Sequence, residues 1–251
     1  MPAFNLHLIA LKREQSVPAF LAHIRSESIN PLVQARPLRW IILPTKRSQH
    51  LLAHNIHWDV LLILPDGDAL SSTTKTYTDH IWSASVKFPA ALSDGYAKFN
   101  STLLNAPAPQ IPPLSGKYPV ANELADFHSK LPDRYRSHPV SMLNFLAFHP
   151  NKREQYSAYG TAFRDKISPK YETHTKLMGH IAGDQARAEG WDEMLLVHQP
   201  SLRHFATMAD DDEYHEINQT YRLGALKDTF ILCVVEVDDD GEPVAQRGSK
   251  L

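Results

Sequence analysis

Histidine is the residue type in this chain best suited to chemistry near neutral pH, and the sequence contains 14 of them. The segment HLLAHNIHW places His50, His54 and His57 at spacings of four and three, which on one helix would bring the imidazoles together as zinc ligands. The segment lies between two predicted strands, however, and no carboxylate pattern of a metallohydrolase accompanies it. The sequence therefore predicts no metal site.

Three other histidines are candidate catalytic residues, because each falls on or beside a predicted strand. His7 lies among apolar residues of the first strand, His174 near the start of a weak strand, and His198 near the end of another. A neutral imidazole at such a position can accept a proton from a substrate and return it. The alternative for His7 is an inert histidine at a strand edge, hydrogen-bonded to the backbone.

Asn144 and Tyr159 are candidate substrate-binding residues of the second half. Asn144 is a polar residue in an otherwise apolar strand, where an amide serves either as a ligand contact or as a buried polar strut. Tyr159 shares a helical stripe with Tyr156 and Phe163, a pattern more typical of core packing than of a ligand site. Both alternatives stay open at these positions.

Tyr214 and Arg222 are the other two candidate substrate-binding residues. They lie eight positions apart, a little over two helical turns, so they share a face approximately. A guanidinium group there can hold a carboxylate through two parallel hydrogen bonds. The favoured alternative is an ion pair between Arg222 and one of three nearby acidic residues, Glu213, Glu216 or Asp228.

Composition and missing motifs exclude several function classes. The formal net charge of −2, without a basic stripe, argues against a nucleic-acid partner, and no apolar run approaches the roughly 20 residues of a membrane span. The chain contains no GxGxxG, GxxxxGK[ST], GxSxG or CxxC motif, so nucleotide cofactors and serine or cysteine nucleophiles have no support. Cys233, the only cysteine, lies in an apolar strand, which predicts a core thiol and a reducing compartment.

The elements that must position these residues repeat along the chain. The phrases HWDVLLILP (57–65) and GWDEMLLVHQP (190–200) both run from Trp-Asp through apolar residues to Pro, and Lys-Arg-Glu-Gln follows the first strand of each half. Because a single active site would not need the phrase twice, we expect both Trp-Asp pairs to be structural and to start strands. The sequence predicts an α+β fold of two βαββαβ units in tandem.

The first unit is expected to span residues 1–104 and the second unit residues 140–237. A Pro-rich linker that contains a short helix, residues 105–139, is expected between them, and a flexible tail is expected at residues 238–251. Strands are predicted at 4–11, 39–45, 58–64, 80–89, 140–148, 174–182, 191–198 and 229–237. Helices are predicted at 17–26, 90–104, 152–167 and 201–225.

The second half resembles the dimeric α+β barrel superfamily, whose ferredoxin-like modules pack their sheets face to face, usually between two chains. The resemblance covers residues 140–237 and rests on the order of MLNFLAF, YSAYGTAF, the Trp-Asp strand and EYHEINQTYR. The spacing from Glu213-Tyr214 to Arg222 is similar to that of a large, mostly uncharacterised branch. The opening HLIALK of the first half resembles stress-response and polyketide-cyclase members. Such a scaffold implies a fold more firmly than an activity.

The resemblance implies an intrachain pseudo-dimeric α+β barrel, because two units on one chain can bury their bare sheet faces against each other. We therefore expect a monomer. It also implies a cavity between the sheet and the helices of each unit, in which His7 and Asn144 occupy equivalent sites. The second unit keeps more of the pattern, so we expect the larger cavity there and a docking role for the first unit.

Two function classes remain. The first is a small-molecule enzyme without a nucleotide cofactor, in which a histidine moves a proton on an apolar aromatic or polyketide-like substrate. Cyclase, lyase and cofactor-free oxygenase reactions all fit that description. The second is a non-catalytic stress-response or binding protein whose cavity holds a hydrophobic ligand or haem.

The last three residues, Ser249, Lys250 and Leu251, form the tripeptide that the peroxisomal import receptor binds. The clustered carboxylates of residues 238–240, followed by Gly241, predict the end of the last strand and a free tail beyond it. We therefore expect the protein in the peroxisomal matrix, or in the cytoplasm if the tripeptide is coincidental.

Overall fold

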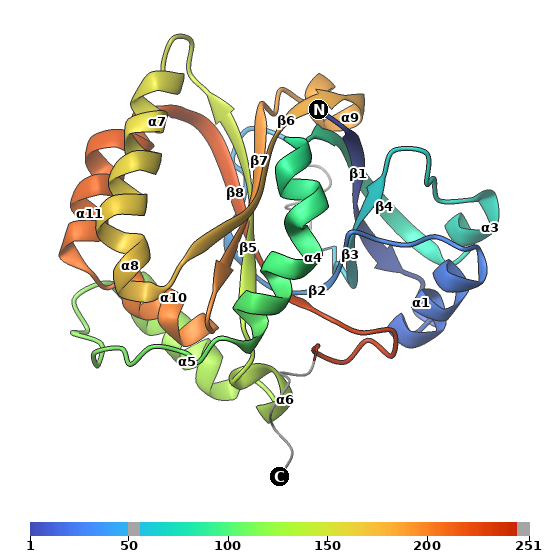
Figure 1. Cartoon of the computed structure of the whole chain (residues 1–251), viewed down its shortest axis with the longest axis horizontal. Coiled ribbons are helices and arrows are strands. Elements are labelled where there is room, and N and C mark those ends of the chain that lie inside the picture. The colour runs from blue at the N-terminus through green and yellow to red at the C-terminus, as the bar shows by residue number, and fades with distance from the viewer. Residues whose placement is uncertain (50–55, 245–251) are drawn as a thin grey trace.

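The computed structural model of the protein describes residues 1–49 and 56–244. Eight antiparallel strands close into a barrel in the order β1-β3-β2-β8-β5-β7-β6-β4, and helices surround it (Figure 1). The protein is thus a mixed α+β protein with a closed antiparallel barrel, consistent with a dimeric α+β barrel. In the described part of the chain, no helix is long and apolar enough to cross a membrane.

The strands of each half lie next to one another in the barrel. Those of the first half follow the order β4-β1-β3-β2 and those of the second half β6-β7-β5-β8, and the two groups meet at β2–β8 and β4–β6. The strands are β1 (Ala3–Leu11), β2 (Val33–Ile42), β3 (Val60–Pro65), β4 (Thr78–Lys87), β5 (Val140–Phe148), β6 (His174–Gly183), β7 (Glu193–Gln199) and β8 (Leu226–Glu236).

The helices of the two halves differ in number and length. The first half and the linker contain α1 (Val17–Ser26), α3 (Ser72–Lys75), α4 (Ala90–Asn105), α5 (Pro119–Lys130) and α6 (Asp133–Arg136). The second half contains α7 (Arg153–Ala162), the π-helical turn η1 (Phe163–Ile167), α8 (Ser168–Tyr171), α9 (Asp184–Ala188), α10 (Leu202–Met208), α11 (Asp212–Ile217) and the π-helical turn η2 (Asn218–Leu223).

Most predicted elements differ from the observed ones by one to three residues at an end, and two differ more. The strand predicted at 39–45 starts earlier, at Val33, because pairing with β3 and β8 tolerates Pro37 at an irregular register. The helix predicted at 201–225 is interrupted, because the Asp211 side chain accepts the backbone N–H groups of Glu213 (2.7 Å) and Tyr214 (3.3 Å) and so starts a new helix. Side-chain capping within a predicted helix is the competing signal that propensity alone misses.

Apolar and aromatic side chains fill the interior of the barrel. Trp82, Phe145, Trp191 and Phe230 are fully buried there, with the rings of Phe145 and Phe230 stacked at 4.7 Å and that of Trp191 edge-on to Phe230 at 5.2 Å. Because strand side chains alternate between faces, the residues next to these in each strand point to the outer face, beneath the helices.

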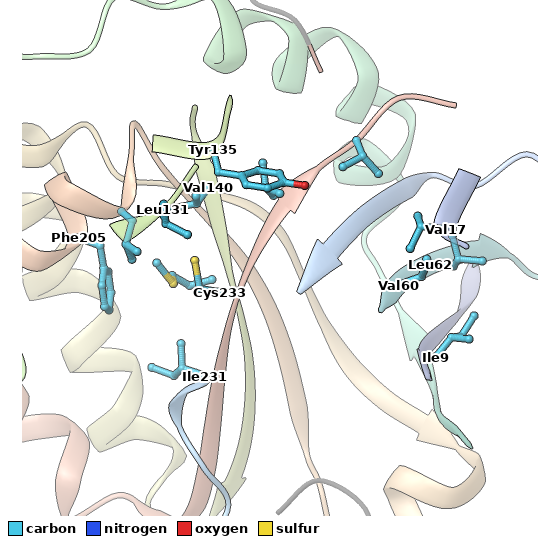
Figure 2. Close-up of a cluster of buried hydrophobic side chains, with 14 of the residues drawn as sticks. Ile9, Val17, Val60, Leu62, Leu131, Tyr135, Val140, Phe205, Ile231 and Cys233 are labelled. Carbon is cyan, nitrogen blue, oxygen red and sulfur yellow. The ribbon is translucent and has the colours of Figure 1, made fainter. Parts of the chain in front are cut away.

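A second apolar cluster lies between the outer face of the strands and the helices (Figure 2). Ile9 and Leu62 pack beneath Val17 of α1, and Ile231 and Cys233 pack with residues of the second half. Burial raises the pKa of the Cys233 thiol to about 12, so this cysteine is a core residue, as the sequence predicts.

The repeated Trp-Asp pairs have the same structural role in both halves. Trp58 and Trp191 are buried in the barrel interior. The Asp59 carboxylate accepts the backbone N–H of Leu11 at 2.8 Å, and the Asp192 carboxylate accepts that of Phe148 at 2.9 Å. Each pair therefore anchors the end of the first strand of its half just before another strand begins.

A buried polar cluster joins α4 to strands of the second half. Lys176 of β6 is 1% exposed and contacts the Glu236 carboxylate of β8. Tyr96 donates to Glu236 at 3.0 Å, Asn100 donates to Glu236 at 2.5 Å, and Lys176 donates to Asn100 at 2.9 Å. Tyr96 and Asn100 thus both hydrogen-bond to the buried ion pair of Lys176 and Glu236. A protein interior tolerates an ion pair when further hydrogen bonds of this kind satisfy it.

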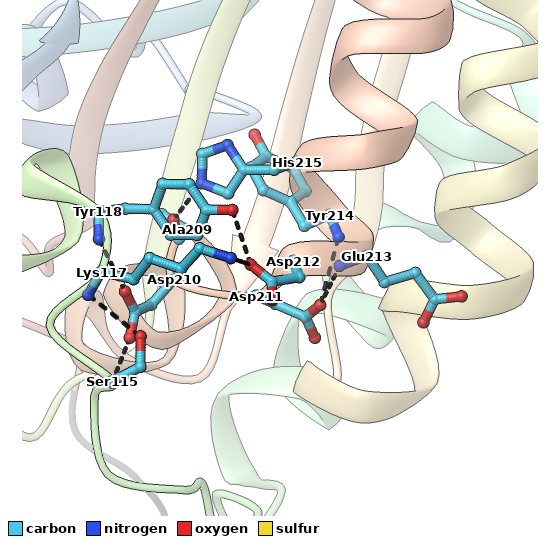
Figure 3. A network of polar contacts seen from close by, with 10 residues as sticks. All are labelled: Ser115, Lys117, Tyr118, Ala209, Asp210, Asp211, Asp212, Glu213, Tyr214 and His215. Carbon is cyan, nitrogen blue, oxygen red and sulfur yellow. Dashed lines mark hydrogen bonds and ion pairs between the residues drawn. The ribbon is translucent and has the colours of Figure 1, made fainter.

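The linker and the start of the tail are also held to the protein. Tyr118 stacks on His215 at 3.5 Å between ring centroids and donates to Asp212 at 2.7 Å (Figure 3). The chain does not leave the barrel at residue 238 as expected. Arg25 pairs with Asp239 at 3.1 Å and Arg134 with Glu242 at 2.8 Å, so residues 238–244 stay against the domain.

Candidate functional site

A cavity of about 670 Å³ lies in the second half, between the outer face of the sheet and the surrounding helices. The period-two alternation of β5 and β7 places one set of side chains in the cavity and the other in the barrel core. The floor comprises residues of β5, β7 and β8: Met142, Asn144, Leu195, Val197, Gln199 and Ile231. The walls include aromatic residues of the helices: Tyr156, Tyr159, Phe163, Phe205 and Tyr214.

Arg222, from η2, is a buried cation that lines this cavity, which the exposed Arg153 and Arg164 line as well. Arg222 is 5% exposed, and its guanidinium group donates only to neutral oxygens, at 3.5 Å to Asn218 Oδ1 and 3.4 Å to Thr229 Oγ1. Both distances lie beyond the usual range for N–H···O bonds. An arginine side chain keeps its charge in proteins, so within the part of the chain that the structure describes these two weak contacts leave a buried positive charge without a negative partner.

Two of the three carboxylates that were expected to neutralise Arg222 are engaged elsewhere. Glu213 pairs with Lys170 at 2.6 Å, and Asp228 accepts the backbone N–H groups of residues 45–47 at 2.7 to 3.0 Å. Within residues 1–49 and 56–244, Arg222 forms no ion pair with any of the three, Glu213, Glu216 or Asp228. The favoured sequence-based alternative for Arg222 is therefore wrong.

Tyrosine hydroxyl groups line the cavity around Arg222. Burial raises the pKa of Tyr156 to about 12, and Arg222 opposes this shift. Burial, followed by the neighbouring Tyr214, raises the pKa of Tyr159 well above its ordinary value. These phenols are therefore protonated at neutral pH and available as hydrogen-bond donors. The stripe of Tyr156, Tyr159 and Phe163 both packs, with ring centroids 5.4 and 5.8 Å apart, and lines the cavity.

A charged cluster that the sequence analysis missed lies at the mouth of the cavity. Glu193 pairs with Arg153 at 2.6 Å and lies 3.3 Å from His180 Nδ1. Burial raises the pKa of the Glu193 carboxyl group, and Arg153 and His180 oppose the shift. Glu193 occurs in the quoted phrase GWDEMLLV, and its alternation with Leu195 and Val197 was the available signal for its position.

Of the three predicted catalytic histidines, His174 and His198 are cross-strand neighbours with ring centroids 6.4 Å apart, whereas His7 lies apart from both. His174 lines the cavity, with its ring edge-on to Phe99 of α4 at 6.2 Å. His198 alternates with the cavity-lining residues and is buried on the same face of β7 as Met194 and Leu196. His7 lies in the first half, on the outer face of β1, with Nδ1 2.8 Å from Ser83 Oγ.

The predicted substrate-binding residues do come together. Asn144, Tyr159, Tyr214 and Arg222 all line the same cavity. The Asn144 amide also donates to the carbonyl oxygen of Met142 at 2.9 Å, so it is both a strut and a cavity-lining residue.

The histidine-rich segment contributes no described cluster. His57 is exposed and lies 3.4 Å from Asp59, while His50 and His54 lie outside the described residues. Among the residues that the structure describes, no group of three or more His, Cys, Asp or Glu side chains is arranged to hold a metal ion.

No protein-family model matches the chain, and no curated protein sequence matches it. Among solved structures, a proposed monooxygenase from Lactobacillus acidophilus is 8% identical, with a TM-score of 0.46 over 97% of this chain and 98% of its own. A proposed monooxygenase from Fusobacterium nucleatum is 7% identical, with a TM-score of 0.47 over 98% of each chain. A protein of unknown function from Rhodopseudomonas palustris is 22% identical, with a TM-score of 0.34 over 49% of this chain and 94% of its own. Likenesses this remote assign no activity.

The buried histidines predict a loss of stability in acid. Burial, with a smaller effect of Lys75, lowers the pKa of His7 from 6.5 to about 4. Between these two values the unfolded chain binds a proton that the folded protein does not, so stability falls as the pH is lowered from 6.5 toward 4. We expect His7→Gln to reduce this slope by up to about 1.4 kcal/mol per pH unit in urea unfolding series.

His198, whose pKa burial lowers to about 3, adds to the same slope and should leave part of it in the variant. Exposed His57 is the matched control, and His57→Gln should unfold like the wild type at every pH. Identical slopes for His7→Gln and the wild type would contradict this origin of the acid sensitivity.

Proposed function

We propose that the protein is a small-molecule enzyme without a nucleotide cofactor that acts on an apolar aromatic or polyketide-like substrate bearing an anionic group. The observation that carries this proposal is Arg222, a buried cation at a largely apolar cavity that has no carboxylate partner among the described residues. Leaving a buried charge uncompensated is costly. A substrate carboxylate or enolate supplies the missing partner through two charge-assisted hydrogen bonds.

The lining of the cavity supports the apolar part of this substrate class. A volume of about 670 Å³ lies within the range of roughly 300–1,000 Å³ that ligand pockets occupy. Aliphatic residues form the floor and aromatic rings the walls, while the tyrosine hydroxyl groups supply a few directional donors. A flat, apolar molecule with one anionic end satisfies both the walls and Arg222.

The same geometry supports proton transfer as the chemistry. Tyr156 lies close enough to both Arg222 and Glu193 that each affects the pKa of its hydroxyl group. We assign Glu193 as the acceptor of a proton from the substrate. Its pKa is raised toward neutral pH, which makes the carboxylate a stronger base. Arg222 and Tyr156 then stabilise the enolate or phenolate that remains. Cyclase, lyase and cofactor-free oxygenase reactions share this first step.

The histidines take a different role from the one that the sequence suggested. His180 is exposed, lines the cavity and lies 3.3 Å from Glu193, so we assign it to proton exchange between Glu193 and solvent. His174 also lines the cavity, but it lies beside His198 at the other end of β6. His7 and His198 lie away from the cavity and have no part in this mechanism.

We also propose that the barrel is an intrachain pseudo-dimer of two ferredoxin-like modules, residues 1–104 and 140–237, joined by the linker 105–139. In each half the fourth strand lies beside the first, then the third and the second, and the two Trp-Asp contacts repeat. The meeting of Tyr214 and Arg222 in the cavity agrees with the proposed similarity of the second module to the uncharacterised branch.

Because the barrel already closes within one chain, we expect a monomer. Light scattering after size-exclusion chromatography should give a single mass near 28.4 kDa. A stable species of twice that mass would argue that each barrel still needs a second chain.

We propose that the protein is imported into peroxisomes through Ser249, Lys250 and Leu251, which lie outside the described residues. A fusion with a fluorescent protein at the N-terminus should appear in peroxisomal puncta in a eukaryotic cell. Deletion of residues 249–251 should disperse it, whereas a full-length fusion that is evenly cytosolic would show that the tripeptide is not read.

Replacing Arg222 should remove the preference of the cavity for anions. The wild type should bind naphthoate more tightly than its neutral isostere naphthamide in calorimetric titrations. Arg222→Gln should weaken naphthoate binding by about 10- to 100-fold, the loss of one charge-assisted hydrogen-bonded pair, and leave naphthamide binding unchanged. The control is Arg13→Gln, since Arg13 is exposed and is not among the residues that line the cavity. Equal naphthoate affinities in Arg222→Gln and Arg13→Gln would remove Arg222 from the site.

Replacing Glu193 should slow proton abstraction. Benzoylacetate has acidic hydrogens between two carbonyl groups, and the wild type should accelerate their exchange with deuterium, followed by NMR. Glu193→Gln should lower the catalysed rate by about 10²- to 10⁴-fold, the usual contribution of a general base, while exposed Glu154→Gln should not. Benzoylacetate binding without any catalysed exchange would favour the alternative, a non-catalytic hydrophobic-ligand, haem-binding or stress-response protein.

A further inference from the structure

A second cavity, of about 790 Å³, lies beside the first, where the ends of β5 and β6 and the start of β8 meet. Arg153 and His180 line both cavities, so the two share a wall. Permanent cations from separate segments converge on this second cavity, which we call the basic pocket: Arg47, Arg153, Arg187 and Lys227.

Carboxylates neutralise only part of this charge. Asp192 is the carboxylate that lines the basic pocket, and both its oxygens are used, by the backbone N–H of Phe148 at 2.9 Å and by Arg187 at 3.0 Å. Glu193, on the shared wall, pairs with Arg153 at 2.6 Å. Arg47 and Lys227 therefore face the pocket without a carboxylate partner in the described part of the chain.

The position of Arg47 is built into the fold. The Asp228 carboxylate accepts the backbone N–H groups of residues 45–47, which fixes the segment that carries Arg47. The Arg47 side chain donates from Nε to the carbonyl oxygen of Gly190 at 2.9 Å, and its terminal nitrogens have no hydrogen-bond partner among residues 1–49 and 56–244. Gly190 has a φ of +90°, and a β-carbon there would lie 2.9 Å from Arg47 Nε, so only glycine allows this approach.

Lys227 completes the pocket from β8. Its ammonium group forms no hydrogen bond or ion pair within the described residues, although the neighbouring Asp228 is close in sequence. Asp228 is occupied by the backbone of residues 45–47 and does not line the pocket. A point charge from lysine beside the planar fork of an arginine is a combination that suits the oxygens of a phosphate group.

We propose that the basic pocket binds a phosphate-bearing group of a small molecule, with Arg47 and Lys227 as its principal contacts. The several cations, gathered in a space this large, fit an anion with more than one negative charge better than a single carboxylate. Because the pocket shares a wall with the apolar cavity, the substrate there carries a phosphorylated arm that extends past Arg153. This second step rests on the proposed function, whereas the anion site itself does not.

Inorganic pyrophosphate is the probe that tests the anion site, by calorimetric titration of the full-length protein at low ionic strength. The wild type should bind pyrophosphate in preference to malonate, a dianion built from carboxylates. Lys227→Gln should weaken pyrophosphate binding by about tenfold, and the charge reversal Lys227→Glu should weaken it further. Lys98→Gln, at an exposed position of α4, changes the net charge equally and should bind like the wild type.

Arg222→Gln distinguishes this site from the apolar cavity, since it should lose naphthoate binding and keep pyrophosphate binding. Thermal unfolding followed by circular dichroism establishes that each variant is folded, and the half-buried Lys227 side chain has no hydrogen bond or ion pair within the described residues to lose. The proposal is overturned if the wild type does not bind pyrophosphate, if malonate binds equally well, or if Lys227→Gln and Lys98→Gln weaken binding alike. Pyrophosphate binding that fails to be weakened by Lys227→Glu would overturn it as well.

Discussion

Closure of the eight-stranded barrel is the constraint on which the rest of the structure depends. A closed antiparallel sheet leaves each strand residue only two environments, the packed interior or the outer face beneath the helices. The interior is filled by aromatic rings such as those of Trp82, Phe145 and Phe230, so no ligand fits there. Both cavities therefore lie outside the barrel, where the helices of the second half stand against β5, β7 and β8 or where the loops meet at the strand ends.

The two halves contribute unequally to this arrangement. The first half supplies strands that close the barrel, and its last helix, α4, places Tyr96 in the buried cluster with Lys176 and Glu236. The same helix brings Phe99 to the rim of the apolar cavity. Residues 45–47 of the first half, whose backbone is hydrogen-bonded to Asp228, position Arg47 in the basic pocket. Residues of the first half thus form part of the lining of both cavities of the second half.

The sequence predicted the strands because they depend on local alternation of apolar and polar residues, and its candidate binding residues Asn144, Tyr159, Tyr214 and Arg222 line one cavity. Glu193 was not among the predicted site residues, and His198 was predicted as a site residue but does not line the cavity. The two residues lie five positions apart on β7, so their side chains face opposite sides of the strand. The surroundings of Arg222 could not be predicted. Glu213 forms ion pairs with lysines of η1 and α8, and Asp228 accepts backbone hydrogen bonds from a loop of the other half. Both sets of contacts exist only in the folded protein.

We propose that Arg222 binds the anionic group of an apolar ligand. A crystal structure of the complex with naphthoate tests it most directly. The account predicts the naphthyl rings against Leu195 and Val197, and both carboxylate oxygens within hydrogen-bonding distance of the Arg222 guanidinium group. Naphthoate bound with its carboxylate at the mouth of the cavity and its rings against Arg222 would contradict the account, and so would an empty cavity at saturating ligand.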